Sequence, residues 1–162
     1  MSIKQIIKSF INTNSNNIDI NIDLDLNSFI NEILNKYKNT NNYLNNKNLI
    51  DVNNELLYIL NNNELFYNKL KNNYRLVNNI QDLYVGKYIR WFILIKNNNI
   101  ENLKLSKGGF VINIKLNYDN NHKILCKIGK NYINIIFENT IVFQKLSLEE
   151  IIILELNNNI TT

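Results

Sequence analysis

Several residue types that most proteins use freely are missing or rare in this chain of 162 residues. It has no alanine and no proline, and only four glycines, one cysteine and one histidine. Asn, Ile and Lys together make up roughly half of the residues, a bias that an AT-rich genome would produce through its codons. Glycines kept against such a bias are expected where the backbone adopts a conformation that a Cβ disfavours. All four lie between positions 86 and 129, so we expect a sheet with specific turns there.

The scarcity of cysteine and histidine limits the chemistry that the chain can carry. Cys126 alone cannot form an intramolecular disulfide, and together with His122 it cannot supply a zinc ligand set. Cys126 also alternates with Ile124 and Ile128, the pattern of an inward-facing strand position, whereas His122 lies in a polar loop. The sequence therefore predicts no catalytic residue, no metal site and no cofactor.

Long hydrophobic runs are also absent. The longest, 91–95 and 151–154, are far shorter than the roughly 20 residues that span a bilayer. The first residues are interrupted by Lys4 and Lys8, which does not fit the apolar core of a signal peptide. We expect a protein that is not secreted and has no membrane span.

The first half of the chain has mostly helical patterns. Apolar residues recur at helical spacing over 3–11 and 29–37, and helices are expected again from Leu56 and from Glu64 onward. Between the first two, residues 18–26 alternate strictly between Ile or Leu and Asp or Asn, which predicts a half-buried strand. We expect residues 1–80 to form a mostly helical N-terminal region.

The second half reads as strands. Five runs rich in β-branched and aromatic residues have short polar joints between them: 83–95, 110–118, 123–128, 132–137 and 141–146. Residues 129–131 predict a hairpin loop, and 147–150 predict a capping box that opens a short C-terminal helix. The fold class expected is α+β, with the helical N-terminal half packed on a five-stranded antiparallel sheet or small partly open β-barrel. Residues 81–162 form this barrel-like region, and both regions are expected to fold as one unit.

Positive charge is concentrated on the expected strands. Residues 81–148 contain ten basic and four acidic side chains, although the whole chain has a net charge of only +4. Strict alternation within 110–118 would place Phe110 and Ile112 on one face and Val111 and Lys115 on the other. The candidate binding surface combines basic and aromatic residues of this region: Lys87, Tyr88, Arg90, Trp91, Lys107, Phe110, Lys115 and Lys127.

Two interpretations of that surface are open. The lysines with Arg90 could meet phosphate while Tyr88, Trp91 or Phe110 stack on bases. Alternatively, the run 85–92 is a central strand packed on both faces, with Arg90 reaching the surface. An exposed Trp91 beside lysines would favour the ligand surface, and a buried Trp91 would favour the packed strand.

Three segments carry a resemblance to a known group of proteins. Together with the Asn, Ile and Lys excess, residues 86–91 (GKYIRW), 107–110 (KGGF) and 143–147 (FQKLS) resemble small uncharacterised proteins of mimivirus-like giant DNA viruses. The resemblance covers about residues 83–150. It implies a viral factory in the host cytoplasm, or the virion, as the setting, and it carries no catalytic residues.

The expected function follows from these observations. The chain is predicted to be a non-catalytic adaptor or structural protein of a large DNA virus that binds another protein through its sheet or its helical half. The alternative is a nucleic-acid-binding protein that uses the basic, aromatic sheet. An enzyme of unknown type is the third possibility. The sequence does not give the oligomeric state.

Overall fold

The computed structural model describes residues 28, 31–32, 35, 47–94 and 103–158. The helices expected over 3–11 and 29–37 and the strand expected over 18–26 fall wholly or largely outside the described residues. The chain divides into two compact units, Met1–Leu49 with Ser147–Thr162, and Ile50–Leu146. The boundary expected at residue 80 lies inside the second unit.

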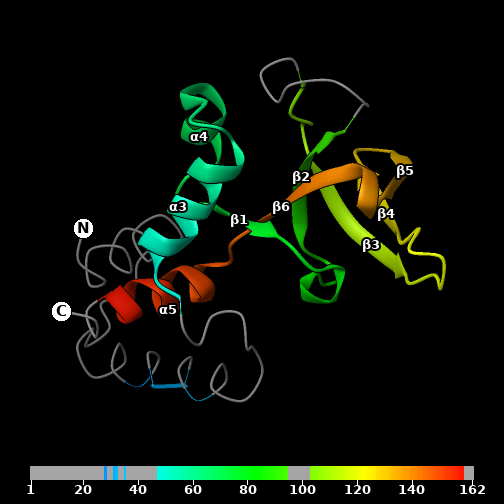
Figure 1. Ribbon diagram of the computed structural model, residues 1–162. Helices are drawn as coiled ribbons and strands as arrows, with labels where there is room; N and C mark the ends of the chain where they lie inside the picture. The colour runs from blue at the N-terminus through cyan, green and yellow to red at the C-terminus, as the bar shows by residue number, and fades with distance from the viewer. Residues whose placement is uncertain (1–27, 29–30, 33–34, 36–46, 95–102, 159–162) are drawn as a thin grey trace. The chain divides into compact units, whose positions relative to one another are not determined.

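The fold is α+β, as expected. In chain order the elements are α3 (Leu49–Ile59), α4 (Glu64–Leu70), β1 (Tyr74–Val77), the 3-10 helix η1 (Ile80–Asp82), β2 (Tyr88–Ile93), β3 (Gly109–Lys115), β4 (Lys123–Ile128), β5 (Asn131–Ile136), the 3-10 helix η3 (Phe137–Asn139), β6 (Thr140–Lys145) and α5 (Leu148–Asn158) (Figure 1).

The strands form one antiparallel sheet of six, in the order β1-β6-β2-β3-β4-β5. The expected count of five was wrong because β1 was missed. Its four residues are all buried, so they lack the alternation that marks a half-buried strand. Arg75 also places a charged side chain in the middle of the segment. Among the described residues the sheet is open, with β1 and β5 as its two edges.

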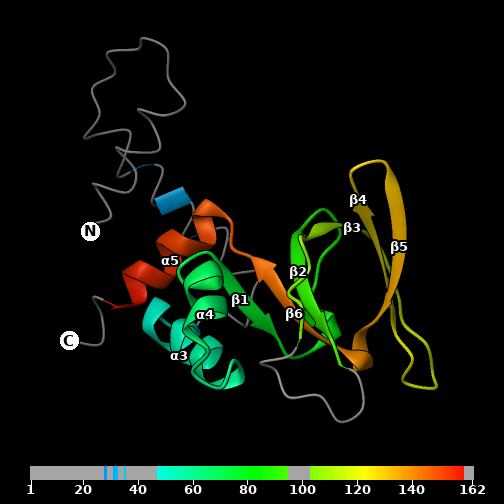
Figure 2. The same cartoon turned by 90° about the horizontal axis from the view of Figure 1, so that it is seen from above.

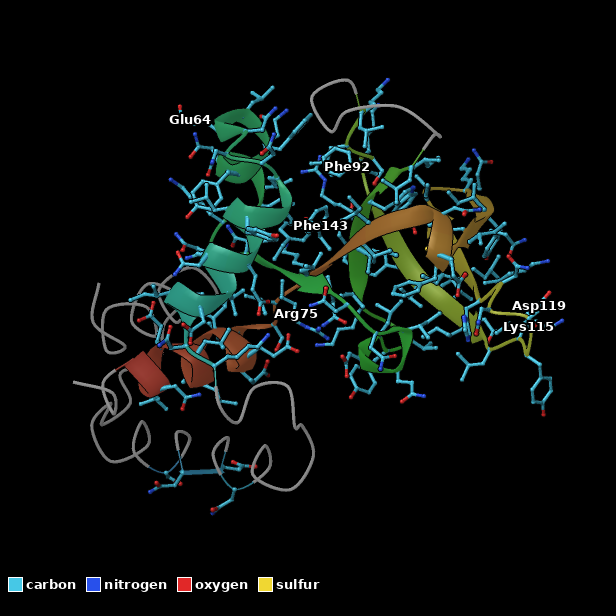
Figure 3. The ribbon with its side chains drawn as sticks, viewed as in Figure 1. Glu64, Arg75, Phe92, Lys115, Asp119 and Phe143 are labelled. Atoms are coloured by element: carbon cyan, nitrogen blue, oxygen red, sulfur yellow. The ribbon has the colours of Figure 1, made fainter. Side chains whose placement is uncertain are left out.

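One face of the sheet is covered by helices at the β1 end. α3 and α4 contribute Leu56, Leu60, Phe66 and Leu70 to a buried cluster with Phe92 of β2 and Phe143 of β6. The Phe92 ring meets Phe66 edge-on at 4.9 Å and Phe143 at 5.8 Å between centroids, a favoured aromatic geometry. Figure 3 shows Phe92 and Phe143 within this part of the unit. In Figures 1 and 2 the two helices lie beside β1, whereas β3, β4 and β5 lie away from them.

The opposite face holds a second buried cluster. Ile89, Trp91, Val111, Ile124 and Cys126 belong to it. Val77 of β1 and Ile135 of β5, from the two edge strands, also belong to it, so the sheet curls around this inner cluster.

Side chains cap two of the helices. Asn63 caps α4, because its side-chain oxygen accepts a hydrogen bond from the Phe66 amide at 3.2 Å. The capping box of α5 is confirmed in the first unit, where Ser147 N donates to Glu150 Oε2 at 2.6 Å and Glu150 N donates to Ser147 Oγ at 3.3 Å.

Candidate functional site

The sheet surface that continues past the helices on β3, β4 and β5 is the candidate functional site. We call it the outer face. Its members are the outward-facing residues of the three strands: Phe110, Asn113, Lys115, Lys123, Leu125, Lys127, Tyr132, Asn134 and Ile136. Leu125 and Ile136 are half-buried and the other members are exposed.

A single row of side chains crosses four strands at one end of this surface. Tyr88 lies opposite Phe110, Phe110 opposite Lys127, and Lys127 opposite Tyr132. Directly opposed residues of antiparallel strands project from the same face, so the four side chains form a continuous line. Tyr88 is half-buried, whereas Phe110 and Tyr132 are 52% and 58% exposed.

Contacts within the row hold its rings in place. The Tyr88 and Phe110 rings meet edge-on with centroids 5.0 Å apart. The Tyr88 hydroxyl donates to the backbone oxygen of Lys107 at 3.0 Å. At the other end, the Lys127 ammonium lies 5.9 Å from the centroid of the Tyr132 ring, within the range of a cation–π interaction. The row therefore offers a positioned aromatic surface beside a positive charge.

A β-bulge brings Lys115 onto the same face as Phe110. The pairing register shifts between Val111, opposite Cys126, and Asn113, opposite Leu125, so Ile112 is an extra residue. The alternation expected over 110–118 was therefore wrong beyond this point. Without the bulge, Lys115 would project into the inner cluster.

Lys115 lies directly opposite Lys123 across β3 and β4. Like charges at opposed strand positions destabilise a sheet. Figure 3 shows Lys115 and Asp119 toward the same end of β3, and Asp119 of the following loop interacts electrostatically with Lys123. The pKa of Asp119 is lowered, mainly by hydrogen bonds from the Asn121 side chain and amide, with a smaller contribution from Lys123. None of the strands β3, β4 and β5 contains an acidic residue.

The structure brings together four of the eight residues predicted from sequence. Tyr88, Phe110, Lys115 and Lys127 share this surface. Lys107 is exposed in the segment that leads into β3.

Three of the eight are placed elsewhere. Trp91 is 4% exposed and belongs to the inner cluster, so its ring is not on the candidate surface, and this favours the interpretation of the run 85–92 as a packed central strand. Arg90 is half-buried, and its Nε donates to the backbone oxygen of Ser106 at 2.9 Å. Lys87 immediately precedes Tyr88, the first residue of β2, so the two side chains project in opposite directions. Lys87 is half-buried.

Two of the basic and aromatic members of the site were missed by the sequence reasoning. Tyr132 and Lys123 become part of it through strand pairing, because Tyr132 lies opposite Lys127 and Lys123 opposite Lys115. The signal for Tyr132 was present in the sequence. A two-residue loop, Gly129–Lys130, pairs Ile128 with Asn131 and so fixes the next pair as Lys127 with Tyr132.

The groups most suited to catalysis are not assembled. The Cys126 side chain is fully buried in the inner cluster, and burial raises the pKa of its thiol to about 11. His122 is engaged by Glu138, whose carboxylate pairs with the imidazole Nδ1 and accepts from the His122 amide at 3.0 Å. Among the residues that the structure describes, no three His, Cys, Asp or Glu side chains are grouped as metal ligands.

Comparisons with protein families, curated proteins and solved structures find no match for this chain. The resemblance to giant-virus proteins stays a prediction. In the described part of the chain, no helix has the length and apolar character needed to cross a membrane. The fold and site define an α+β protein with an exposed basic and aromatic sheet face.

Proposed function

We propose that the outer face binds single-stranded nucleic acid. The observation that carries the proposal is the row from Tyr88 to Tyr132, in which exposed rings flank Lys127 on a face with two further lysines and no carboxylate. Aromatic rings on a sheet can stack on unpaired bases of any sequence, and lysines beside them can meet the phosphates.

The dimensions of the row suit an unstacked strand. Neighbouring strands lie about 4.8 Å apart, so Phe110 on β3 and Tyr132 on β5 are separated by about 10 Å across β4. Each ring has room for one base, and Lys127 lies between them. In a duplex the base faces are covered by their neighbours, so a stacking surface of this kind favours single strands.

The opposed lysines support an anionic ligand. Lys115 and Lys123 occupy directly opposed positions, where like charges are unfavourable, and a phosphate between them would make attractive contacts with both. An apolar or basic partner would leave this repulsion in place. The expected role as a viral adaptor that binds a protein stays a prediction, and on this face it requires an acidic partner.

The test is binding of a fluorescent oligothymidine of about 12 nucleotides, followed by anisotropy, with duplex DNA compared at the same salt. We expect the single strand to bind more tightly. With three lysines at phosphates, log K should fall against log salt with a slope of about −2. Phe110→Ala and Tyr132→Ala should each weaken binding by about 5- to 150-fold.

Tyr58→Ala is the matched control, because Tyr58 is 87% exposed on α3, away from the outer face. It should leave the affinity unchanged. Absence of salt-dependent binding by the wild-type protein would refute the proposal. Equal losses in Tyr58→Ala and Phe110→Ala would refute the assignment to this face.

A further inference from the structure

The outer edge of β5 is not paired with another strand of the described residues. β5 is the last strand of the sheet, and within the described residues it pairs only with β4. Its sequence, Asn-Tyr-Ile-Asn-Ile-Ile, contains no charged residue and no glycine. Proteins usually protect a free edge with a charge, a proline or a bulge, because unpaired backbone groups invite another strand. None of these devices lies within β5.

The hairpin geometry shows which backbone groups face this edge. Residues that flank a two-residue loop exchange hydrogen bonds with each other, here Ile128 and Asn131. The alternate positions Tyr132, Asn134 and Ile136 therefore direct their backbone groups away from β4. At the Ile136 end, the carbonyl accepts a bond from the Thr140 hydroxyl at 3.2 Å.

The edge is complementary to itself. If two copies of β5 pair antiparallel with Asn134 opposite Asn134, each Tyr132 lies opposite Ile136 of the second copy. Aromatic residues opposite β-branched ones are favourable cross-strand pairs, and two asparagine side chains can bond to each other. On the inner side the same register places Ile133 opposite Ile135 of the second copy.

Charge at the ends of the strand agrees with this register. Lys130 precedes β5 in the hairpin loop, and Glu138 follows it in η3. They are equally far from Asn134 in the sequence, so the hairpin loop of each copy, with Lys130, lies at the same end of the joined strands as η3 of the other, with Glu138. A parallel arrangement would instead bring like charges together.

We infer that the free edge of β5 pairs with β5 of a second copy, giving a two-fold dimer with one continuous sheet. The occupant is a second copy because hydrophobic pairs, amides and charges all match under a single two-fold operation. The dimer extends the outer face of one copy into that of the other, which would lengthen the proposed nucleic-acid surface. A single strand pair buries an area well below the roughly 1,200 Å² of stable complexes. The association should therefore be weak.

The test is disulfide trapping in the full chain. In Asn134→Cys the introduced thiols meet on the two-fold axis, where opposed Cα atoms about 5.5 Å apart suit a disulfide. Tyr132→Cys is the matched control, on the same strand and face. Its thiols would lie about 13 Å apart in the dimer, beyond disulfide reach. The native Cys126 is buried and should not interfere.

We expect Asn134→Cys to form disulfide dimers at least about 10-fold faster than Tyr132→Cys under mild oxidation. Equal rates of disulfide formation in the two variants would indicate random collision, and faster trapping of Tyr132→Cys would indicate another register. Either result would overturn the inference. So would monomeric wild-type protein in sedimentation at all concentrations up to the millimolar range.

A second variant separates the dimer from nucleic-acid binding. Asn134→Lys places two like charges on the axis and should abolish dimerisation, and sedimentation in the absence of nucleic acid measures this. Asn78→Lys carries the same charge change at an exposed position after β1 and should dimerise like the wild type. A dimeric Asn134→Lys protein would contradict the inference whatever the outcome of the nucleic-acid experiment.

Discussion

The ring of Tyr88 lies directly against the backbone of Gly108. A Cβ placed on Gly108 would meet the Tyr88 Cε1 at 2.5 Å, closer than side chains approach. Gly108 also has a φ of +103°, in the region that favours glycine. The position of the Tyr88 ring, and with it the edge contact to Phe110, therefore depends on this glycine.

Replacing this glycine should affect both stability and binding. Gly108→Ala is expected to lower the free energy of unfolding by about 1–3 kcal/mol through backbone strain and the ring clash, and to weaken oligothymidine binding by displacing Tyr88. Denaturant unfolding and anisotropy measure the two effects. Gly86→Ala is the control, because Gly86 has a φ of +88° but nothing within 4 Å of its added Cβ. If both variants lose the same free energy of unfolding, the contact between the Tyr88 ring and Gly108 contributes nothing to stability.

The opposed lysines predict effects of opposite sign on stability and binding. Lys123→Gln removes the repulsion with Lys115 and should raise the free energy of unfolding by about 0.2–0.5 kcal/mol. It should also weaken binding of the single strand and reduce the salt slope by about 0.7. Lys69→Gln on α4 removes the same charge from another surface and should leave the slope unchanged. A loss of stability in Lys123→Gln would show that the attraction between Lys123 and Asp119 outweighs the repulsion between the two lysines.

The fold could be predicted in part because some of its signals are local. Gly129 marked one hairpin, although its loop has the two residues 129–130 and not the three expected, and Ser147 with Glu150 marked the start of α5. The strand β1 could not be recognised, because its burial comes from distant elements. Arg75, for example, donates to Oε1 of Gln144, which lies 69 residues away in the sequence.

The candidate site depends on features that the simple alternation of side chains between the two faces of a strand does not predict. The bulge at Ile112 decides that Lys115 projects with Phe110, and no local residue type marks it. Trp91 looked suited to stacking, but both faces of β2 are covered, so its ring belongs to the core. Aromatic residues of central strands are therefore weaker predictors of a ligand surface than those of strands near an edge.

The thiol of Cys126 should be unreactive in the folded protein. Its side chain is fully buried, and a pKa of about 11 leaves only about one thiolate in a thousand at pH 8. We expect a disulfide reagent at pH 8 to label it only at the rate at which the sheet opens, and completely after denaturation. Rapid labelling of the native protein would show that the inner cluster is accessible and would reopen the question of a catalytic thiol.

The pair between His122 and Glu138 should make stability depend on pH in the acid range. Partial burial alone would raise the pKa of Glu138, but the hydrogen bonds from His122 and from backbone amides, with the charge of His122, outweigh it, so the pKa lies below its ordinary value of 4.5. A carboxyl group with a lowered folded-state pKa stabilises the protein above its ordinary pKa, and this contribution is lost as the pH falls through the folded-state value. Because the pair is near the surface, we expect it to contribute at most about 1 kcal/mol.

Glu138→Gln should therefore flatten the fall in unfolding free energy between about pH 5 and pH 3, and chemical denaturation at several pH values measures this. Glu64→Gln, which removes an exposed carboxylate in the first turn of α4, is the control. The Glu138→Gln variant retains a side-chain amide oxygen that can accept a hydrogen bond from the His122 amide. The connection between the start of β4 and η3 should therefore persist at neutral pH. A wild-type acid profile in Glu138→Gln would show that the carboxylate charge contributes nothing to the stability of this end of the sheet.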